Sequence, residues 1–335
     1  AVQKITNFLQ GLDQVLVVEE LEPILEEQIK ILIQEHGLAV KVFGKSTDLP
    51  NFGEFCTRNV KKALNNLLPE AHELEKGCDT AENLPQRPPN LCAGCSHRAT
   101  YYAVRQVFGD NAVYSSDIGC YTLGILPPLC TADFLFCMGS SISGGSGMAR
   151  VIDQPAIAFI GDSTFFHSGI TGLVNAIYNQ HELLLVILDN KTTAMTGHQP
   201  HPGVDQTLHG NNPSKVDLEQ IVRGCGVEQI RKVKPFNHKS TLKALEELKD
   251  LSGVRVLISE EPCTLFARRI QGKKPVQTAY VAEDHPDVRH CAEELACPAF
   301  YLQEEKIRIN EDQCTGCMLC VQACAYIKAR KRSGH

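Results

Sequence analysis

The stretch from residue 156 to residue 190 constrains the fold of this chain more than any other. It holds two apolar runs, AIAFIGD at 156–162 and LLLVILDN at 183–190, which are typical of buried central strands. The residues between them, HSGITGLVNAIYNQ at 167–180, have the pattern of a helix. Strand, helix and strand in this order predict a parallel sheet. Asp162 and Asn190 then lie at the carboxyl ends of its strands, where open α/β sheets bind ligands.

The same alternation continues on both sides of this stretch. Before it, QVLVVEE at 14–20 and LAVKVFG at 38–44 are expected to be strands, with helices over 25–36 and about 53–68. After it, VDLEQIVRGCG, EQIRKV, KSTLKALEELKD and VRVLISEE follow as helix, strand, helix and strand. We therefore predict an α/β fold with doubly wound parallel sheets in two domains, at 1–80 and 91–280, joined by a polar, proline-rich linker at 81–90.

The last segment, at 281–335, contains six cysteines and few apolar residues, so it is expected to need a metal or a cluster to fold. The whole chain has 15 cysteines, and its start, AVQKITNFLQGLDQ, lacks the pattern of a secretion signal. These features favour thiolate ligands in a reducing cytoplasm over a disulfide framework. Five cysteines without a partner at ligand spacing are expected to be buried as small apolar side chains: Cys56, Cys78, Cys130, Cys137 and Cys225.

Composition excludes two classes of partner. The net charge of −6 argues against a nucleic-acid binder, whose surface would be basic. No run of about 18 apolar residues occurs, so no membrane span is expected.

The residues at the two strand ends have the chemistry of a magnesium and phosphate site. Asp162 offers a carboxylate and Asn190 an amide carbonyl, which are hard oxygen ligands suited to Mg²⁺. Gly161 is expected to let the backbone approach a phosphate, and a helix beginning near His167 would present N–H groups to an anion. The alternative is an ordinary strand-end turn that the Asp162 side chain caps.

This combination resembles the motif of thiamine diphosphate enzymes, GDG followed after about 25 residues by Asn. Longer strings narrow the resemblance: RPPNLCAGCSHRATYYAV, SDIGCYTLGILPPL, MGSSIS, GDSTFFHSGI and LDNKTTAMTGHQPHPG are similar to the large (alpha) subunit of indolepyruvate ferredoxin oxidoreductase. The similarity covers essentially the whole chain. It implies a thiamine diphosphate-binding fold at 91–280, a domain of the transketolase C-terminal type at 1–80 and a ferredoxin-like α+β iron–sulfur domain at 281–335.

The resemblance also implies site residues. Mg²⁺ would be held by Asp162, Asn190 and the backbone carbonyl of Thr192, and the aminopyrimidine side of the cofactor by the turn at 138–140. The complete set of implied cofactor contacts is Met138, Gly139, Ser140, Gly161, Asp162, Ser163, Thr164, Asn190, Thr192 and Thr196.

The activity that the resemblance implies is oxidative decarboxylation of an aryl 2-oxoacid to an aryl-acetyl-CoA. Electrons would pass through [4Fe–4S] clusters to ferredoxin, with coenzyme A as co-substrate and a smaller beta subunit as partner. The glutamate that activates thiamine belongs to a pyrimidine-binding domain that precedes the matching segment in this family and is not found here. No catalytic residue is therefore assigned, although His97 is a candidate.

Three other functions stay open: a non-catalytic electron-transfer or assembly subunit, a truncated fragment of a thiamine-dependent 2-oxoacid enzyme, and a non-oxidative decarboxylase.

Four cysteines outside the tail match a cluster-binding set in related 2-oxoacid ferredoxin oxidoreductases. We name them the proximal quartet: Cys92, Cys95, Cys120 and Cys263. Four thiolates are what a [4Fe–4S] cluster requires, although zinc or redox-inactive thiols are alternatives. His97 and Arg98, beside Cys95, are expected to face the diphosphate or the substrate carboxylate; otherwise His97 is an ordinary loop residue.

The tail carries the cysteine run of bacterial ferredoxins, in which the fourth cysteine ligates the other cluster of a two-cluster domain. The partner run would end at Cys297-Pro298 with Cys291 as its third cysteine, but His285 and Val288 stand where its first two cysteines belong. We therefore predict one tail cluster, on a set named here the tail quartet: Cys297, Cys314, Cys317 and Cys320. Cys291 and Cys324 are weaker candidates, and a local quartet that ends at Cys324, or a zinc ion, is the alternative.

Overall fold

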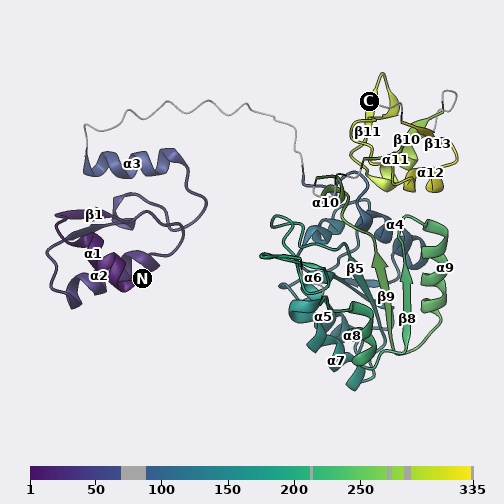
Figure 1. The fold of residues 1–335 in the computed structure, drawn as a ribbon, viewed down its shortest axis with the longest axis horizontal. Helices are drawn as coiled ribbons and strands as arrows, with labels where there is room; N and C mark the ends of the chain where they lie inside the picture. The colour runs from purple at the N-terminus through teal and green to yellow at the C-terminus, as the bar shows by residue number, and fades with distance from the viewer. Residues whose placement is uncertain (69–87, 212–213, 270–271, 273, 283–287, 333–335) are drawn as a thin grey trace. The chain divides into compact units, whose positions relative to one another are not determined.

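Five parallel strands form the central sheet of the protein, as the computed structural model shows (Figure 1). The structure describes residues 1–68, 88–211, 214–269, 272, 274–282 and 288–332. The chain divides into two compact units, Ala1–Gln86 and Arg87–His335, and the sheet belongs to the second. Its strands run in the order β3 (Val113–Ser115), β4 (Ala156–Gly161), β5 (Leu183–Asp189), β9 (Val254–Glu260) and β8 (Gln229–Val233).

Helices cover both faces of this sheet, because successive strand residues point to opposite faces and both faces are apolar. On one face, α4 (Ser96–Phe108) and α9 (His238–Lys249) pack with Phe159 and Val186. On the other face, α5 (Ser140–Met148), α7 (Ile170–Tyr178) and α8 (Leu218–Gly224) pack with Ile160 and Leu185 (Figure 1). The predicted doubly wound parallel sheet is confirmed.

The helix that follows β4 begins earlier than the sequence pattern predicted. It starts at Asp162, directly after the strand, with α6 (Asp162–Thr164), continues through a π-helical turn, η3 (Phe165–Gly169), and ends as α7. The expected start near His167 was wrong by five residues, because the GDS stretch is itself helical. The first-turn N–H groups therefore belong to the GDS stretch at the sheet edge.

The N-terminal unit is a small α/β structure. It comprises α1 (Val2–Leu9), β1 (Gln14–Leu16), α2 (Ile24–Glu35), β2 (Lys41–Phe43), a short 3₁₀ turn η1 (Lys45–Thr47) and α3 (Thr57–Leu67). The two strands are parallel, and Leu9, Val17 and Ile29 form its core. The predicted alternation is present, with shorter strands than expected. Its likeness to the transketolase C-terminal type stays a prediction.

The cysteine-rich segment forms two small antiparallel sheets, β10 (Gln277–Val281) with β13 (Ile327–Lys331), and β11 (Phe300–Gln303) with β12 (Lys306–Ile309). Its helices are α11 (Arg289–Leu295) and α12 (Leu319–Ala323). Leu295 and Leu319 pack against Ala99 and Tyr102 of α4, so this segment lies on the second unit rather than apart from it. Its ferredoxin-like character stays a prediction.

The remaining elements are short: η2 (Cys120–Ile125), α10 (Thr264–Arg269) and the two-residue strands β6 (Gln206–Thr207) and β7 (Gly210–Asn211). Three expected features fall wholly or partly outside the described residues, namely the linker at 81–90, Cys78 and His285. Within the described residues, no helix is long and apolar enough to cross a membrane.

Candidate functional site

Asp162 is the centre of the site at the carboxyl edge of the sheet. Its side chain is only 2% exposed, and its two oxygens receive backbone N–H groups from Ser163 and Lys191, each at 2.7 Å. The imidazole Nε2 of His201 lies 3.0 Å from Asp162 Oδ2. Gly203 N donates to His201 Nδ1 at 3.2 Å, so Nδ1 is an acceptor in this ring and Nε2 is the nitrogen nearer the carboxylate. The turn after β4 thus holds a buried carboxylate in a fixed orientation.

Asn190 follows the neighbouring strand β5 and meets the same edge. Its Oδ1 accepts the Thr192 N–H at 3.1 Å, and its Nδ2 lies 3.2 Å from His97 Nε2. The intervening Lys191 has a φ of +63°, an unusual value for a residue with a side chain. This left-handed turn brings the Lys191 N–H to Asp162, so backbone strain at Lys191 links the two predicted metal ligands.

His97 is buried, at 3% exposed, beside Asn190. Burial lowers the pKa of His97 to about 4, with the charge of Asp162 acting in the opposite direction. The imidazole is therefore neutral near pH 7 and accepts a hydrogen bond from the Asn190 amide through Nε2. His97 thus belongs to this site rather than to an ordinary loop.

Gly161 is required for a reason that the sequence did not indicate. A Cβ atom at this position would lie 2.6 Å from the Tyr121 ring, so glycine is required by the close approach of that ring. The Tyr121 hydroxyl in turn donates to Thr164 Oγ1 at 3.1 Å, and Thr193 donates to Ser163 Oγ at 2.7 Å. The expected contacts Ser163 and Thr164 therefore lie at the site, held by side-chain hydrogen bonds.

The turn at 138–140 is held by a residue that sequence reasoning missed. The buried carboxylate of Asp117 accepts N–H groups of Gly139 at 2.7 Å and Ser141 at 3.0 Å, which occupies the beginning of α5. Met138 is 43% exposed. Nothing in the local sequence marks Asp117, because its partners are 22 and 24 residues away.

Thr196 is placed differently from the other expected cofactor contacts. Its side chain lies in an exposed turn and donates to Gln199 Oε1 at 2.7 Å. This turn is closed by a bridge between Thr193 and Gln199. Among the described residues, Thr196 has no contact with Asp162 or Asn190.

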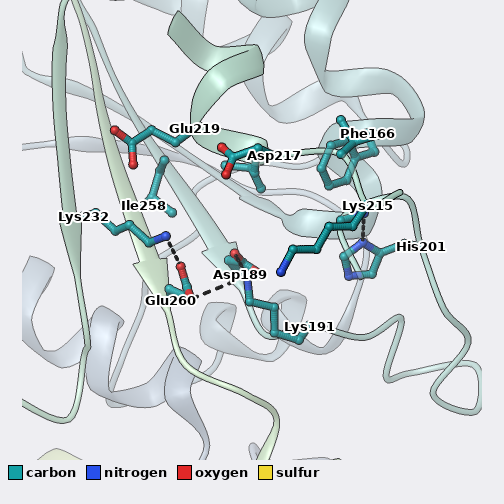
Figure 2. Close-up of a pocket in the computed structure, with 13 residues that line it drawn as sticks. Phe166, Asp189, Lys191, His201, Lys215, Asp217, Glu219, Lys232, Ile258 and Glu260 are labelled. Carbon is teal, nitrogen blue, oxygen red and sulfur yellow. Dashed lines mark hydrogen bonds and ion pairs between the residues drawn. The ribbon is translucent and has the colours of Figure 1, made fainter. Parts of the chain in front are cut away.

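A cavity of about 110 Å³ adjoins the His201 side of the site and holds a network of charges (Figure 2). Lys191 Nζ lies 2.6 Å from Asp189 Oδ2 and 3.6 Å from Glu260 Oε1, and Lys232 pairs with Glu260. Burial raises the pKa of Asp189 to about 6, the charge of Asp162 adds to this shift, and Lys191 opposes it. The network fixes the side chain of Lys191, the residue whose backbone orients Asp162.

The proximal quartet lines one pocket, although its members come from three separate segments. The same pocket is lined by His97, Asn190 and His198. Cys263 N donates to the Asn190 carbonyl at 2.9 Å, so one member of the quartet is one hydrogen bond away from a predicted metal ligand. Burial raises the pKa of Cys95 to about 12, which keeps this thiol protonated unless a metal or cluster displaces the proton.

The tail quartet also gathers in space. Cys297 and Cys320 pack in one cluster with the buried Cys314. Burial raises the pKa of Cys320 to about 12, and the other three members of the quartet add to this shift. The two weaker candidates, Cys291 and Cys324, are bonded to each other as a disulfide, with 6.1 Å between their Cα atoms. That bond differs from the expected thiolates and leaves neither sulfur free to act as a ligand.

Other cysteine and charge expectations need correction. Cys56, Cys130 and Cys137 are exposed rather than buried, and Cys225 is half-buried.

Arg98 does not face Asp162: its guanidinium donates to the carbonyls of Leu91 and Leu295, in the direction of the tail. Successive helix residues point about 100° apart, so His97 and Arg98 reach opposite surroundings. Within the described ranges, no three His, Cys, Asp or Glu side chains converge on a single metal ion.

Comparison with known proteins shows what this chain is similar to. Residues 117–259 match the thiamine pyrophosphate enzyme C-terminal TPP binding domain. The indolepyruvate oxidoreductase subunit IorA of Methanothermobacter thermautotrophicus is 41% identical over 327 residues, which are 96% of this chain and 52% of that protein. The subunit of the same name from Archaeoglobus fulgidus is 41% identical over 332 residues, which are 96% of this chain and 52% of that protein.

A solved 2-oxoglutarate:ferredoxin oxidoreductase from Magnetococcus marinus aligns with a TM-score of 0.48 at 16% identity, over 54% of this chain and 69% of that chain. The chain spans about half the length of the curated relatives it matches. Residues 117–259 therefore match the thiamine pyrophosphate enzyme C-terminal TPP binding domain, and the chain as a whole is similar to about half of an indolepyruvate oxidoreductase subunit IorA.

Proposed function

We propose that this chain is the thiamine-binding and electron-exit part of a cytoplasmic indolepyruvate (arylpyruvate) ferredoxin oxidoreductase. The complete enzyme would convert an aryl 2-oxoacid and coenzyme A to an aryl-acetyl-CoA and CO₂, and would reduce ferredoxin. A smaller beta subunit would complete it. The observation that carries the proposal is the pocket in which the proximal quartet meets His97 and Asn190, because it joins an electron acceptor site to a thiamine site.

The residues at the sheet edge fit Mg²⁺ and a diphosphate. Asp162 and Asn190 offer hard oxygen atoms on adjacent parallel strands, and the buried Thr192 hydroxyl has no hydrogen-bond partner among the described residues. Thiamine diphosphate, when bound, supplies the nucleophile for the 2-oxo carbon and accepts the electron pair that CO₂ leaves behind. The chain contributes orientation: the Lys191 N–H holds the Asp162 carboxylate, and neutral His97 holds the Asn190 amide.

The raised pKa values of the buried cysteines favour a role as iron ligands over a role as redox-active thiols. Buried thiols with raised pKa values are poor nucleophiles but good ligands once iron displaces their protons. A cluster at the proximal quartet would take electrons beside the thiamine, and a cluster at the tail quartet would pass them to ferredoxin.

Calorimetry of thiamine diphosphate binding with and without Mg²⁺ tests the cofactor site. Asp162→Asn keeps the volume of the side chain but removes the charge that a cation needs. Loss of residues that only support metal ligands costs 10–100-fold in affinity, so loss of this ligand should weaken Mg²⁺-dependent binding by at least about 100-fold. Asp153→Asn, at an exposed turn, is the matched control and should bind normally.

Equal affinity in both variants, or binding that ignores Mg²⁺, would refute the cofactor assignment. Anaerobic electron paramagnetic resonance of the dithionite-reduced protein tests the clusters separately, and a spectrum without iron–sulfur signals would refute the electron-exit role.

A further inference from the structure

Arg98 is a buried cation without an acidic partner. Its side chain lies on α4, one turn after Cys95, and the residue is 2% exposed. No carboxylate pairs with it among the residues that the structure describes. A buried unpaired charge is costly, by several kcal/mol in general, so its retention calls for a nearby anion.

The neutral partners of Arg98 tie two cysteine segments together. Nη2 donates to the carbonyl of Leu91 at 2.5 Å, directly before Cys92, and to Asn90 Oδ1 at 3.2 Å. Nη1 donates to the carbonyl of Leu295 at 2.6 Å, two residues before Cys297. Nε is buried and has no hydrogen-bond partner in the described part of the chain. One N–H of the guanidinium thus remains available for a further acceptor.

Cysteines of both quartets lie in the segments that Arg98 ties together. Burial lowers the pKa of Arg98, and four of these cysteines would oppose that shift as thiolates, in the order Cys297, Cys95, Cys317 and Cys92. The two quartets also touch through their loops. A Cβ atom on Gly94, between Cys92 and Cys95, would lie 1.8 Å from Thr315 Oγ1, between Cys314 and Cys317.

A four-iron cluster on four thiolates is anionic, and it gains one more negative charge when it accepts an electron. Its reduction potential depends on nearby charge and on hydrogen bonds to its sulfurs. A fixed positive charge between two such clusters stabilises the reduced form of each and therefore raises both potentials. It also screens the repulsion between the clusters when an electron moves from one to the other.

We propose that Arg98 is the electrostatic link between two iron–sulfur clusters, one on the proximal quartet and one on the tail quartet. Its guanidinium holds the two cysteine segments in register and raises the reduction potentials of both clusters. This role rests on the proposed function, because it requires a cluster at each quartet. Arg98 acts as a positioning residue and does not touch the substrate.

The test is an anaerobic, dithionite-driven redox titration of the complete protein, followed by electron paramagnetic resonance. Arg98→Gln removes the charge, and both clusters should shift to more negative potentials. At a fixed potential the ratio of reduced to oxidised cluster should fall about tenfold, which is a shift of about 59 mV for one electron. Arg98→Lys keeps the charge and should shift both potentials much less.

Arg223→Gln is the matched control, because this arginine lies exposed on α8 and pairs with Glu219. Its potentials should equal those of the unmodified protein. Should Arg98→Gln lose its clusters while Arg98→Lys keeps them at nearly normal potentials, the requirement for charge is upheld.

A shift in Arg98→Gln no larger than in Arg223→Gln would overturn the inference. Loss of both clusters in Arg98→Lys as well would assign Arg98 a purely structural role and overturn it too. Absence of cluster signals from the unmodified protein would instead refute the proposed function, and that result does not depend on any variant.

Discussion

Replacing Gly94 by alanine is the sharpest test of how the two cysteine loops pack. Gly94 has a φ of +65°, and a Cβ atom there would lie 1.8 Å from Thr315 Oγ1 and 2.9 Å from Thr315 Cβ. Thr264 Oγ1 also holds the Gly94 carbonyl, at 2.5 Å, so the loop cannot easily turn away. The added methyl group must therefore push the loop at 92–95 away from the loop at 314–317.

The cost has two parts. A residue with a Cβ atom in the left-handed region costs about 1–2 kcal/mol, and overpacking costs about 1–3 kcal/mol more. The sum, about 2–5 kcal/mol, should speed hydrogen exchange in the first turn of α4 and at 314–320 by roughly 30-fold or more, since each 1.4 kcal/mol is a factor of ten. Hydrogen exchange with mass spectrometry measures this locally, without assuming two-state unfolding of the whole chain.

Gly109→Ala gives a backbone cost without a clash. Gly109 follows α4 with a φ of +59° and a ψ of −141°, a conformation that favours glycine, and has open space around it, so alanine there should cost about 1–3 kcal/mol with no overpacking. Adding Thr315→Ala to Gly94→Ala removes the closest clashing atom and should recover at least about 1 kcal/mol. If Thr315→Ala brought no recovery, the packing of one loop against the other would be refuted.

Two further predictions follow from the cysteines and from His97. Cys297→Ala should abolish the tail cluster signal and lower the iron content, whereas Cys324→Ala should leave both unchanged; the opposite pattern would support the local quartet. His97 has a pKa of about 4 in the folded protein and an ordinary value of 6.5, so the folded state favours the neutral ring. Its stabilising contribution is complete above pH 6.5 and is lost as the pH falls toward 4, which costs about 2 kcal/mol between pH 7 and pH 5. His97→Gln keeps a hydrogen-bond acceptor for Asn190 but cannot titrate. Its unfolding temperature should therefore vary less between pH 7 and pH 5 than that of the unmodified protein, and an identical pH dependence in the two proteins would contradict the reasoning.

The parallel sheet was predictable because its signal is local. Phe159 and Ile160 alternate between two apolar faces within one run, and Asp162 and Asn190 end two such runs. The meeting of these two side chains follows from the parallel order of the strands alone. The sequence therefore predicted the part of the site that strand ends create.

The supporting residues were not predictable in the same way. His201 reaches Asp162 from a loop 39 residues later, and Asp117 reaches Gly139 across 22 residues, with no local pattern to mark either. Arg98 was assigned to the wrong partner because the direction of a helix side chain depends on how the helix is rotated against its neighbours. The close approach of the Tyr121 ring to Gly161 was not predictable either, and the expected contact of Gly161 with a phosphate stays a prediction.

The disulfide between Cys291 and Cys324 spans a sequence separation of 33 and so turns the tail into a covalent ring. All four cysteines of the tail quartet lie inside that ring. Closing a loop of this length removes about 3–4 kcal/mol of conformational entropy from the unfolded chain, and it keeps the four thiols at a high effective concentration before iron arrives. Ring closure and cluster loading nevertheless make opposite demands on the surroundings, because the bond forms by oxidation and the quartet binds iron as reduced thiolates.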